Sequence, residues 1–290
     1  MNGDILRGRM SFALGALRLL PRNWLSRAAG RFAAWRLPGP CVRAEIALFA
    51  RAFGVDLGEV REPLDSFESL QAFFTRALRD GARPLDPDPA ALLSPCDGSW
   101  GTAGAIRDGL LLQLKGESYA LARLLASEPD ARRYEGGQYA TLYLSPRDYH
   151  RFHAPADVTI ERALHVPGTL WPVNRAGLEG VPGLFARNER ICAHALAQTG
   201  PLCLVAIGAT LVGKVRLAFD PGLTTQSGRT STEHRYAGAE PKLTRGAEWG
   251  RFEFGSTLVL LLAPGTAALA PAEPGTPVRL GQRIGRLGRA

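Results

Sequence analysis

Paired cysteines are missing from this 290-residue sequence, and their absence excludes two kinds of stabilised small domain. The four cysteines are Cys41, Cys96, Cys192 and Cys203, and no two of them form a CxxC pair. A disulfide framework or a zinc ribbon is therefore not expected. We interpret all four as reduced thiols of a cytoplasmic protein.

The sequence also lacks an apolar run long enough to cross a bilayer. Residues 191–213 contain no Asp, Glu, Lys or Arg, but His194 and the Gly200-Pro201 pair divide them into short pieces. Residues 255–272 are uncharged as well, and prolines interrupt them after a short apolar run. Both segments are more typical of buried strands than of membrane spans.

Acidic residues are scarce at one end of the chain, and this uneven charge suggests a partner. The apolar share of 46% and mean hydropathy of −0.05 indicate a folded protein, either one large domain with an appendage or two domains. Of the formal charge of +8, residues 1–51 carry +7, with nine arginines against Asp4 and Glu45. A nucleic-acid-binding domain usually spreads its basic residues over the fold, so an anionic membrane surface is the better match.

The N-terminal region is predicted to be helical. Trp24, Ala28, Phe32 and Trp35 recur at helical spacing, and arginines flank this apolar face. Packing of the face on the protein's own core is the alternative that periodicity leaves open. The concentration of arginine favours the membrane, so we assign residues 1–62 as a helical, basic, membrane-associating region.

Further along the chain, helical patterns give way to short apolar runs between Gly and Pro turns. Helices are expected over residues 42–53 and 66–78, and a short one over 121–126. Strands are expected over residues 110–114, 139–144, 158–160, 202–207, 210–217 and 252–262. The predicted fold class is α+β, in which the helical segment precedes a β-rich, mostly antiparallel or barrel-like domain over residues 63–290.

Histidine is rare, and two of the five histidines stand close together. His150 and His153 follow the predicted strand at residues 139–144, so two imidazoles on one loop could serve acid–base catalysis. A purely structural role for the pair is an equally good interpretation. Zinc binding by His-x-x-His needs at least a third ligand, and no second His or Cys pair is nearby, so no metal is expected.

Two further sequence features could join these histidines in one site. Asp97 lies in a Cys-Asp-Gly turn, where Asp is usually only a turn residue, but its carboxylate could orient His153. Gly255-Ser256 precedes an apolar run, and a turn before a buried strand is the simpler interpretation. A strained Gly-Ser peptide can also rearrange, because the Ser hydroxyl can attack the preceding carbonyl when an imidazole is near.

Taken together, these residues closely resemble the bacterial phosphatidylserine decarboxylases. The matching stretches occur in the same order over most of the chain, and their joint occurrence is far more specific than any one of them. They are Phe73-Phe74-Thr75-Arg76-Ala77-Leu78 with Arg83-Pro84-Leu85, Ser94-Pro95-Cys96-Asp97-Gly98, Leu114-Lys115-Gly116-Glu117-Ser118-Tyr119, residues 143–153, Val166-Pro167-Gly168, residues 184–190 and residues 250–257.

The resemblance implies a self-processing enzyme. Its processing residues fall on Asp97, His153 and Ser256, with His150 as the second catalytic histidine, and the chain is cut between Gly255 and Ser256. A pyruvoyl group, covalent and derived from Ser256, then forms a Schiff base with phosphatidylserine, which loses CO2 to become phosphatidylethanolamine. His150 or His153 returns a proton to the carbanion.

The resemblance also implies partners and a location. The substrate lies in an anionic membrane, the two chains from one precursor stay associated, and the enzyme is a homodimer on the cytoplasmic face of the cell membrane, held peripherally. Pyridoxal phosphate would need one of the only three lysines, Lys115, Lys214 and Lys242, and the cleavable Gly-Ser bond makes it unnecessary. Phe254 replaces the leucine of the commonest cleavage motif, which is one apolar residue for another.

Other functions are also compatible with these features. A related pyruvoyl enzyme could act on a soluble amino acid or on the archaetidyl analogue of phosphatidylserine, although the basic, apolar N-terminal region argues against a soluble substrate. A non-enzymatic membrane adaptor would use the same histidines and Gly-Ser-Thr for structure alone. An intact full-length chain without a carbonyl group would favour the adaptor.

Overall fold

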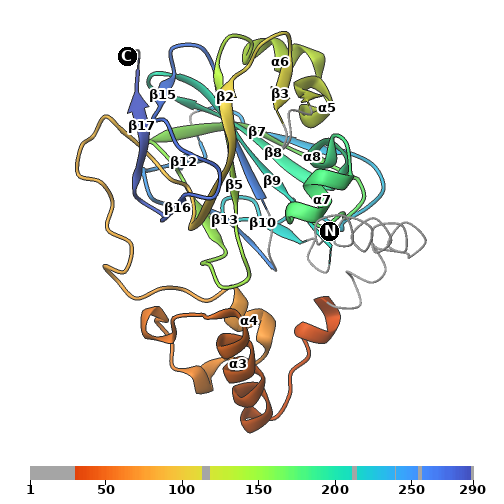
Figure 1. The fold of residues 1–290 in the computed structure, drawn as a ribbon, viewed down its shortest axis with the longest axis vertical. Coiled ribbons are helices and arrows are strands. Elements are labelled where there is room, and N and C mark those ends of the chain that lie inside the picture. Colours follow the sequence, from red (N-terminus) through yellow and green to blue (C-terminus); the bar gives the residue numbers. More distant parts are fainter. Residues whose placement is uncertain (1–29, 113–117, 211–213, 239, 254–256, 289–290) are drawn as a thin grey trace, which may run out of the picture.

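A large antiparallel sheet forms the centre of the computed structural model, which describes residues 30–112, 118–210, 214–238, 240–253 and 257–288 (Figure 1). Its strands, from one edge to the other, are β11 (Thr232–Arg235), β7 (Val158–Val166), β8 (Arg190–Ala197), β9 (Gly200–Ile207), β14 (Thr257–Leu262), β5 (Gln138–Tyr143), β2 (Gly98–Ala105) and β16 (Pro277–Val278), and β12 (Lys242–Leu243) also pairs with β7. The mostly antiparallel β-rich prediction is confirmed. The described strands leave β11 and β16 as open edges, so the barrel-like alternative is not found.

Strand β14 is buried on both faces of this sheet. Leu258, Leu260 and Leu262 enter one hydrophobic cluster, whereas Val259 and Leu261 enter a second cluster on the opposite face. Side chains alternate between the faces of a strand, so a strand covered on both sides needs an unbroken apolar sequence. This requirement explains the apolar run at the end of the predicted strand 252–262.

Smaller sheets cover one face of the large sheet, and short helices cover the other (Figure 1). The smaller sheets are β10 (Val215–Leu217), β13 (Glu248–Phe252) and β6 (Arg151–His153), and β1 (Ala91–Leu93), β17 (Arg283–Leu287) and β15 (Ala267–Leu269). The helices α5 (Leu121–Leu125), α6 (Glu128–Arg133), α7 (Arg175–Gly180) and α8 (Leu184–Arg187) lie near the hairpin of β3 (Leu110–Leu112) and β4 (Ser118–Ala120). The first cluster thus lies between sheets, and the second lies between sheet and helices.

A helical lobe, defined here as residues 39–78, lies at one end of the sheets (Figure 1). It contains α3 (Gly39–Phe53), the 3-10 turns Leu57–Glu59 and Leu64–Ser66, and α4 (Leu70–Phe74). The spacing of Val42, Ile46 and Ala50 puts their side chains on one face of α3, where they pack with residues as far along as Phe73. The domain boundary at residue 62 stays a prediction, since this cluster includes residues on both sides of it.

Several predicted elements differ from the observed ones. Among the described residues, the strand expected over residues 210–217 is only Val215–Leu217, and the strand expected over 158–160 extends to Val166. The helix expected over residues 66–78 is only Leu70–Phe74, because the Ser69 hydroxyl caps its start by accepting from the Ala72 amide. Residues 252–262 are two strands, since β13 ends at Phe252 and β14 begins at Thr257. Sequence periodicity did not reveal that these two apolar segments belong to different sheets.

The apolar residues of the N-terminal region are only partly described. Phe32 and Trp35 are 64% and 61% exposed, whereas Trp24 and Ala28 lie outside the described residues. Among the described helices, none has the length and apolar character to span a membrane. The membrane-associating role of this region remains a prediction.

The two sides of α3 give a test of the lobe's packing. Ile46 is fully buried, so we expect Ile46→Ala to lower the free energy of unfolding by about 2–5 kcal/mol, through lost burial and the cavity left behind. Leu48 is 71% exposed, and Leu48→Ala is expected to change it by less than about 0.5 kcal/mol. Urea denaturation of both variants measures the difference, and equal losses would contradict this assignment of the buried face.

Candidate active site

The two predicted histidines and Asp97 lie among the described residues, whereas Gly255 and Ser256 do not. Asp97 directly precedes β2, His150 directly precedes β6, and His153 is the last residue of β6. Strand β6 belongs to a small sheet, and β2 belongs to the large one. The candidate site is therefore built where the two sheets meet.

The chain that leads to Ser256 is fixed beside His150. The amide of Phe252 donates to the His150 carbonyl at 2.9 Å, and the amide of Glu253 donates to the Lys214 carbonyl at 2.9 Å. Four residues of extended chain span at most about 14 Å, so Ser256 cannot lie farther than this from Phe252. The described chain that leads towards Ser256 is thus hydrogen-bonded to His150 four residues before the predicted cleavage serine.

The chain that leaves Ser256 is fixed in the large sheet. Thr257 is the first residue of β14 and is paired with Tyr143 on β5 and Ile207 on β9. The hydroxyls of Thr257 and Thr141 are buried and have no hydrogen-bond partner in the described part of the chain. Both residues line a small cavity of about 30 Å³. One unpaired hydroxyl thus belongs to the residue after the predicted cleavage serine, and a second lies on the neighbouring strand β5.

His150 is a completely buried neutral imidazole. Its Nδ1 lies 2.8 Å from the Asp148 carbonyl oxygen, which can only accept, so Nδ1 carries the proton. Its Nε2 is buried and without a partner among the described residues, and the Phe74 ring lies 4.0 Å from the imidazole centroid. Burial lowers the pKa of His150 to about 3, and Nε2 therefore offers a lone pair at neutral pH.

His153 is also held in one tautomer by a carbonyl. Its Nδ1 donates to the Gly246 carbonyl at 2.8 Å, and its Nε2 lies 3.3 Å from the Tyr149 hydroxyl. Burial lowers the pKa of His153, while the Gly246 hydrogen bond and the carboxylates of Glu248 and Asp97 act in the opposite direction. A neutral imidazole whose protonated form is stabilised by nearby carboxylates is suited to act as a general base.

Asp97 does not orient His153 through a direct hydrogen bond. The Asp97 carboxylate accepts from Arg83, with Nη2–Oδ2 and Nε–Oδ1 distances of 2.6 and 2.9 Å, and from the Leu280 amide at 2.9 Å. The Gly246 carbonyl sets the tautomer of His153 instead. The influence of Asp97 on His153 is electrostatic, since the carboxylate stabilises the protonated ring without touching it.

Arg83 is a site residue to which the sequence analysis gave no role. Its guanidinium, only 9% exposed, binds Asp97 on one side and Glu59 on the other, the latter through Nη1–Oε1 at 2.9 Å and Nη2–Oε2 at 2.7 Å. The hydrogen bond from Arg83 holds the pKa of Glu59 below its usual range. The sequence feature that could have identified Arg83 is its position in Arg83-Pro84-Leu85, one of the stretches that resemble the family. Arg83 thus connects the helical lobe to Asp97.

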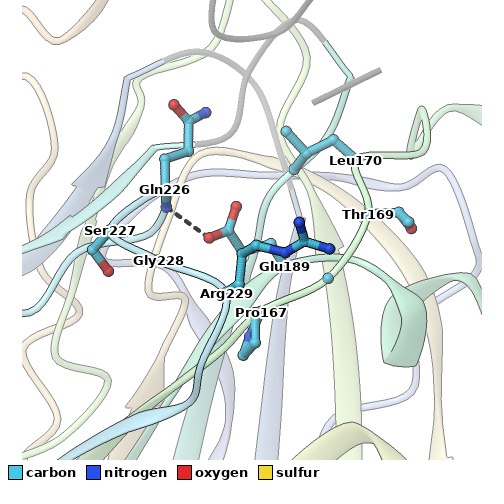
Figure 2. Close-up of a pocket in the computed structure, with 9 residues that line it drawn as sticks. Pro167, Thr169, Leu170, Glu189, Gln226, Ser227, Gly228 and Arg229 are labelled. Atoms are coloured by element: carbon cyan, nitrogen blue, oxygen red, sulfur yellow. Dashed lines mark hydrogen bonds between the residues drawn. The ribbon is translucent and has the colours of Figure 1, made fainter. Parts of the chain in front are cut away.

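A larger cavity of about 800 Å³ opens beside the ends of β8 and β9 (Figure 2). The carboxylate of Glu189 lies at the wall of this cavity. It accepts from His165 Nε2 at 2.8 Å and from the backbone amide of Gln226 at 2.6 Å. Arg229 is exposed in the same wall and pairs with no residue of the described ranges. The lining residues are Pro167, Gly168, Thr169, Leu170, Glu189, Gln226, Ser227, Gly228 and Arg229.

Strand register relates this cavity to the predicted cleavage site. Arg190, which follows Glu189, pairs with Ile207, and Ile207 pairs with Thr257. Neighbouring strands are about 4.8 Å apart, so Arg190 and Thr257 are separated by about 10 Å across the sheet. Glu189, at the cavity wall, therefore directly precedes a residue that lies two strands from the start of β14. Residues 167, 168 and 189 lie in stretches that resemble the family by sequence, whereas no sequence pattern marked Gln226–Arg229.

Within the described ranges, no three His, Cys, Asp or Glu side chains are grouped closely enough to bind a metal ion. The acid–base groups of the site are thus two neutral histidines, a tyrosine and a carboxylate fixed by arginine. Burial raises the pKa of Tyr149 to about 12, so its hydroxyl keeps its proton and donates to His153 Nε2. This arrangement can remove a proton from a hydroxyl and store it on an imidazole.

Comparison with known proteins agrees with the resemblance seen in the sequence. Residues 70–286 match the family model described as phosphatidylserine decarboxylase. Three similar proteins, each named phosphatidylserine decarboxylase proenzyme, come from Anaeromyxobacter sp. (strain K), Azotobacter vinelandii and Pseudomonas aeruginosa. The identities are 44% over 275 residues, 43% over 285 and 43% over 270.

These similarities extend over nearly the whole of each protein. The aligned regions cover 94%, 95% and 91% of this chain and 97%, 97% and 93% of the three relatives, in the same order. The family match includes Asp97, both loop histidines and the Gly255-Ser256 pair. On this evidence, the chain belongs to the phosphatidylserine decarboxylase family.

Proposed function

We propose that the chain is a proenzyme that cuts its own Gly255–Ser256 bond and then decarboxylates phosphatidylserine to phosphatidylethanolamine and CO2. Membership of the family makes it a decarboxylase, a carbon–carbon lyase of phospholipid biosynthesis. The observation that carries the self-processing step is the fixing of the chain on both sides of Ser256, at His150 and at the start of β14. An adaptor without catalysis would not explain the family match.

The cleavage begins with transfer of a proton from the Ser256 hydroxyl to Nε2 of His153. The Ser256 oxygen then attacks the Gly255 carbonyl carbon, the peptide C–N bond breaks, and the amide nitrogen takes a proton, which leaves an ester. Loss of the Ser256 α-proton expels the Gly255 carboxylate and leaves dehydroalanine. One water converts its imine tautomer into a pyruvoyl group and ammonia.

Asp97 and Arg83 support this step from a distance. The carboxylate of Asp97 stabilises the protonated form of His153, and Arg83 keeps that carboxylate fixed in place. Tyr149 donates to His153 Nε2 before cleavage, so its hydroxyl must turn aside when Nε2 takes the Ser256 proton. These roles make Asp97, His153 and Ser256 the processing residues.

The position of β14 keeps the two products together. It is hydrogen-bonded to β5 on one side and to β9 on the other, and all six of its residues are buried. A strand in the middle of a sheet cannot leave without breaking both ladders and exposing both hydrophobic clusters. The 35-residue chain that begins at Ser256 therefore stays bound to residues 1–255.

The residues after the cleavage bond fit a pyruvoyl group. Unpaired, buried hydroxyls of Thr141 and Thr257 can donate to its carbonyl oxygens, and Nε2 of His150, which lies beside the chain before the cleavage bond, is an unpaired acceptor in the described part of the chain. The group supplies a ketone that condenses with the serine amine of the lipid and accepts the electron pair released with CO2. His150 Nε2 takes a proton and returns it to the α-carbon of the product.

The large cavity is the proposed site of the lipid head group. Arg229, without a partner in the described chain, can bind the phosphodiester, and Glu189 can attract the ammonium group before it condenses. Glu189, next to Arg190, lies about two strands from Thr257, and Arg229 lines the same cavity, which suits a head group that extends from phosphate to amine. This location favours a phospholipid over a soluble amino acid, which has no phosphate for Arg229.

The N-terminal region is the proposed membrane contact, on the cytoplasmic face of the cell membrane. Phe32, Trp35, Leu48 and Phe53 are exposed apolar side chains in or near the helical lobe. Exposed arginines stand among them, a combination that suits a surface lying on anionic lipid. The homodimer implied by the sequence resemblance stays a prediction.

Self-processing is tested by intact mass spectrometry of the purified protein. We expect two chains, with the smaller one containing the last 35 residues and a pyruvoyl N-terminus, whereas Ser256→Ala stays uncut because it has no nucleophile. His153→Ala and Asp97→Ala should remain largely uncut. His150→Ala should be cut and yet decarboxylate phosphatidylserine poorly. Cleavage of Ser256→Ala at the same bond would rule out processing by this serine.

The head-group assignment is tested with a short-chain, water-soluble phosphatidylserine. A charge-assisted hydrogen bond contributes roughly 1.5–3 kcal/mol, so we expect Arg229→Gln to raise KM at least about tenfold with a smaller change in kcat. Arg235→Gln is the matched control, since Arg235 is exposed and paired with Glu233 outside the cavity. An unchanged KM in Arg229→Gln would remove Arg229 from substrate binding.

Membrane contact is tested by flotation with phosphatidylglycerol vesicles. A variant that lacks residues 1–36, and the double variant Phe32→Ser/Trp35→Ser, should bind more weakly than the full chain, and the effect of the deletion should shrink as salt rises. Leu196→Ser is the control, because Leu196 is an exposed apolar residue on β8 of the sheet, away from the lobe. Equal binding by all variants at low salt would assign the region to packing instead.

A further inference from the structure

Three consecutive residues at the end of α4 contact the histidine loop, defined here as residues 147–151. The Phe74 ring packs on the His150 imidazole, with centroids 4.0 Å apart. The Thr75 carbonyl accepts from Arg151 Nε at 3.0 Å. Arg76 Nη2 donates to the carbonyls of residues 147 and 148, at 3.0 and 3.2 Å. The helical lobe thus holds the loop at its side chains and at its backbone.

One of these contacts acts on the tautomer of His150. The Asp148 carbonyl oxygen accepts from both His150 Nδ1 and Arg76 Nη2. Because Arg76 fixes this oxygen in place, the ring nitrogen facing it must carry a proton, and Nε2 is left with its lone pair. The position of the Asp148 carbonyl therefore decides which nitrogen of His150 is free.

Arg76 is an unusual residue to find in this position. It is only 4% exposed, and burial lowers the pKa of its guanidinium, although the carboxylates of Asp97, Glu59 and Asp148 act in the opposite direction without a direct ion pair in the described chain. Its Nε and Nη1 are buried without a hydrogen-bond partner in the described part, and the guanidinium lies over the Phe73 ring, 5.1 Å from the centroid. A buried, unpaired cation is costly, so stability alone does not explain it.

We infer that Arg76 is a positioning residue for decarboxylation, which fixes the Asp148 carbonyl and thereby holds His150 with Nε2 free to take and return a proton. The inference rests on the proposed role of His150. It goes beyond that role, because it assigns the orientation of a catalytic imidazole to a residue of the helical lobe.

The charges around His150 support the same assignment. Burial is the main cause of its lowered pKa, the hydrogen bond to Asp148 acts in the opposite direction, and the cationic Arg76 lowers the pKa further. The other charged side chains near the ring are engaged elsewhere. The Asp148 carboxylate accepts from Ser145, Arg151 binds Glu248, and on the segment after β13 Glu253 binds Arg216. Arg76 is thus the nearby charged side chain that lowers the pKa of His150.

The test compares Arg76→Met with Arg79→Met. Arg79 belongs to the same segment and also donates to a backbone carbonyl, that of Val60, but it does not contact the histidine loop. The chain has only five histidines, so ¹⁵N-histidine labelling gives few imidazole signals, and the His150→Ala spectrum identifies the one from His150. Kinetics are measured on phosphatidylserine in detergent micelles.

In Arg76→Met, we expect the ¹⁵N signals of His150 to change from one Nδ1-protonated form to a mixture, and its pKa to rise because a cation is lost. Loss of positioning should lower kcat about 10- to 100-fold with KM within about threefold of wild type. Arg79→Met should keep the wild-type spectrum and kcat. Arg76→Lys keeps the charge and a donor, so it should recover part of both, and it carries the test if Arg76→Met does not fold.

The outcomes separate this inference from the proposed function. If His150→Ala loses activity while Arg76→Met keeps the wild-type imidazole signals and kcat, the positioning role is overturned and the role of His150 stands. If Arg76→Met changes kcat with the His150 signals unchanged, positioning through the Asp148 carbonyl is also overturned. If His150→Ala is fully active, the proposed role of His150 fails, and the inference fails with it.

Discussion

Strand β14 has a hydrogen-bonded neighbour on each side and a hydrophobic cluster on each face, and this double burial constrains the rest of the structure. Its first residue, Thr257, is fixed between β5 and β9, directly after the bond that the chain is proposed to cut. A new N-terminus at Ser256 would directly precede the first residue of this buried strand. Catalytic groups need such a support, because small displacements of a reacting atom are costly to the rate.

His150 and His153 are subject to a different physical constraint, because their imidazoles must stay reactive although they are buried. Burial makes the charged form unfavourable, so both rings are neutral at physiological pH. A backbone carbonyl fixes the proton of each ring on Nδ1, and Nε2 of each is directed elsewhere, to Tyr149 for His153 and to no described partner for His150. The two residues have the same chemistry but different surroundings, which favours separate roles.

The helical lobe reaches the site by two independent routes. Glu59 binds Arg83, which holds Asp97, and the end of α4 contacts the histidine loop, which carries His150. The exposed face of the same lobe carries apolar and basic residues suited to a membrane surface. The helical lobe thus contacts both the Asp97 side and the His150 side of the candidate site, and it also carries the proposed lipid contact.

The sequence by itself determined the class of the fold, the helix α3, the apolar core of β14 and the identity of the family, because these depend on periodicity, residue type and motif order along the chain. It also selected His150, His153 and Asp97 as candidates. It did not reveal that Asp97 binds Arg83, or that carbonyls of Asp148 and Gly246 orient the imidazoles. Every residue except proline has the same backbone donor and acceptor, so no residue type marks such a partner. Only the packing of the lobe and the two sheets decided which carbonyl, which arginine and which ring nitrogen would meet.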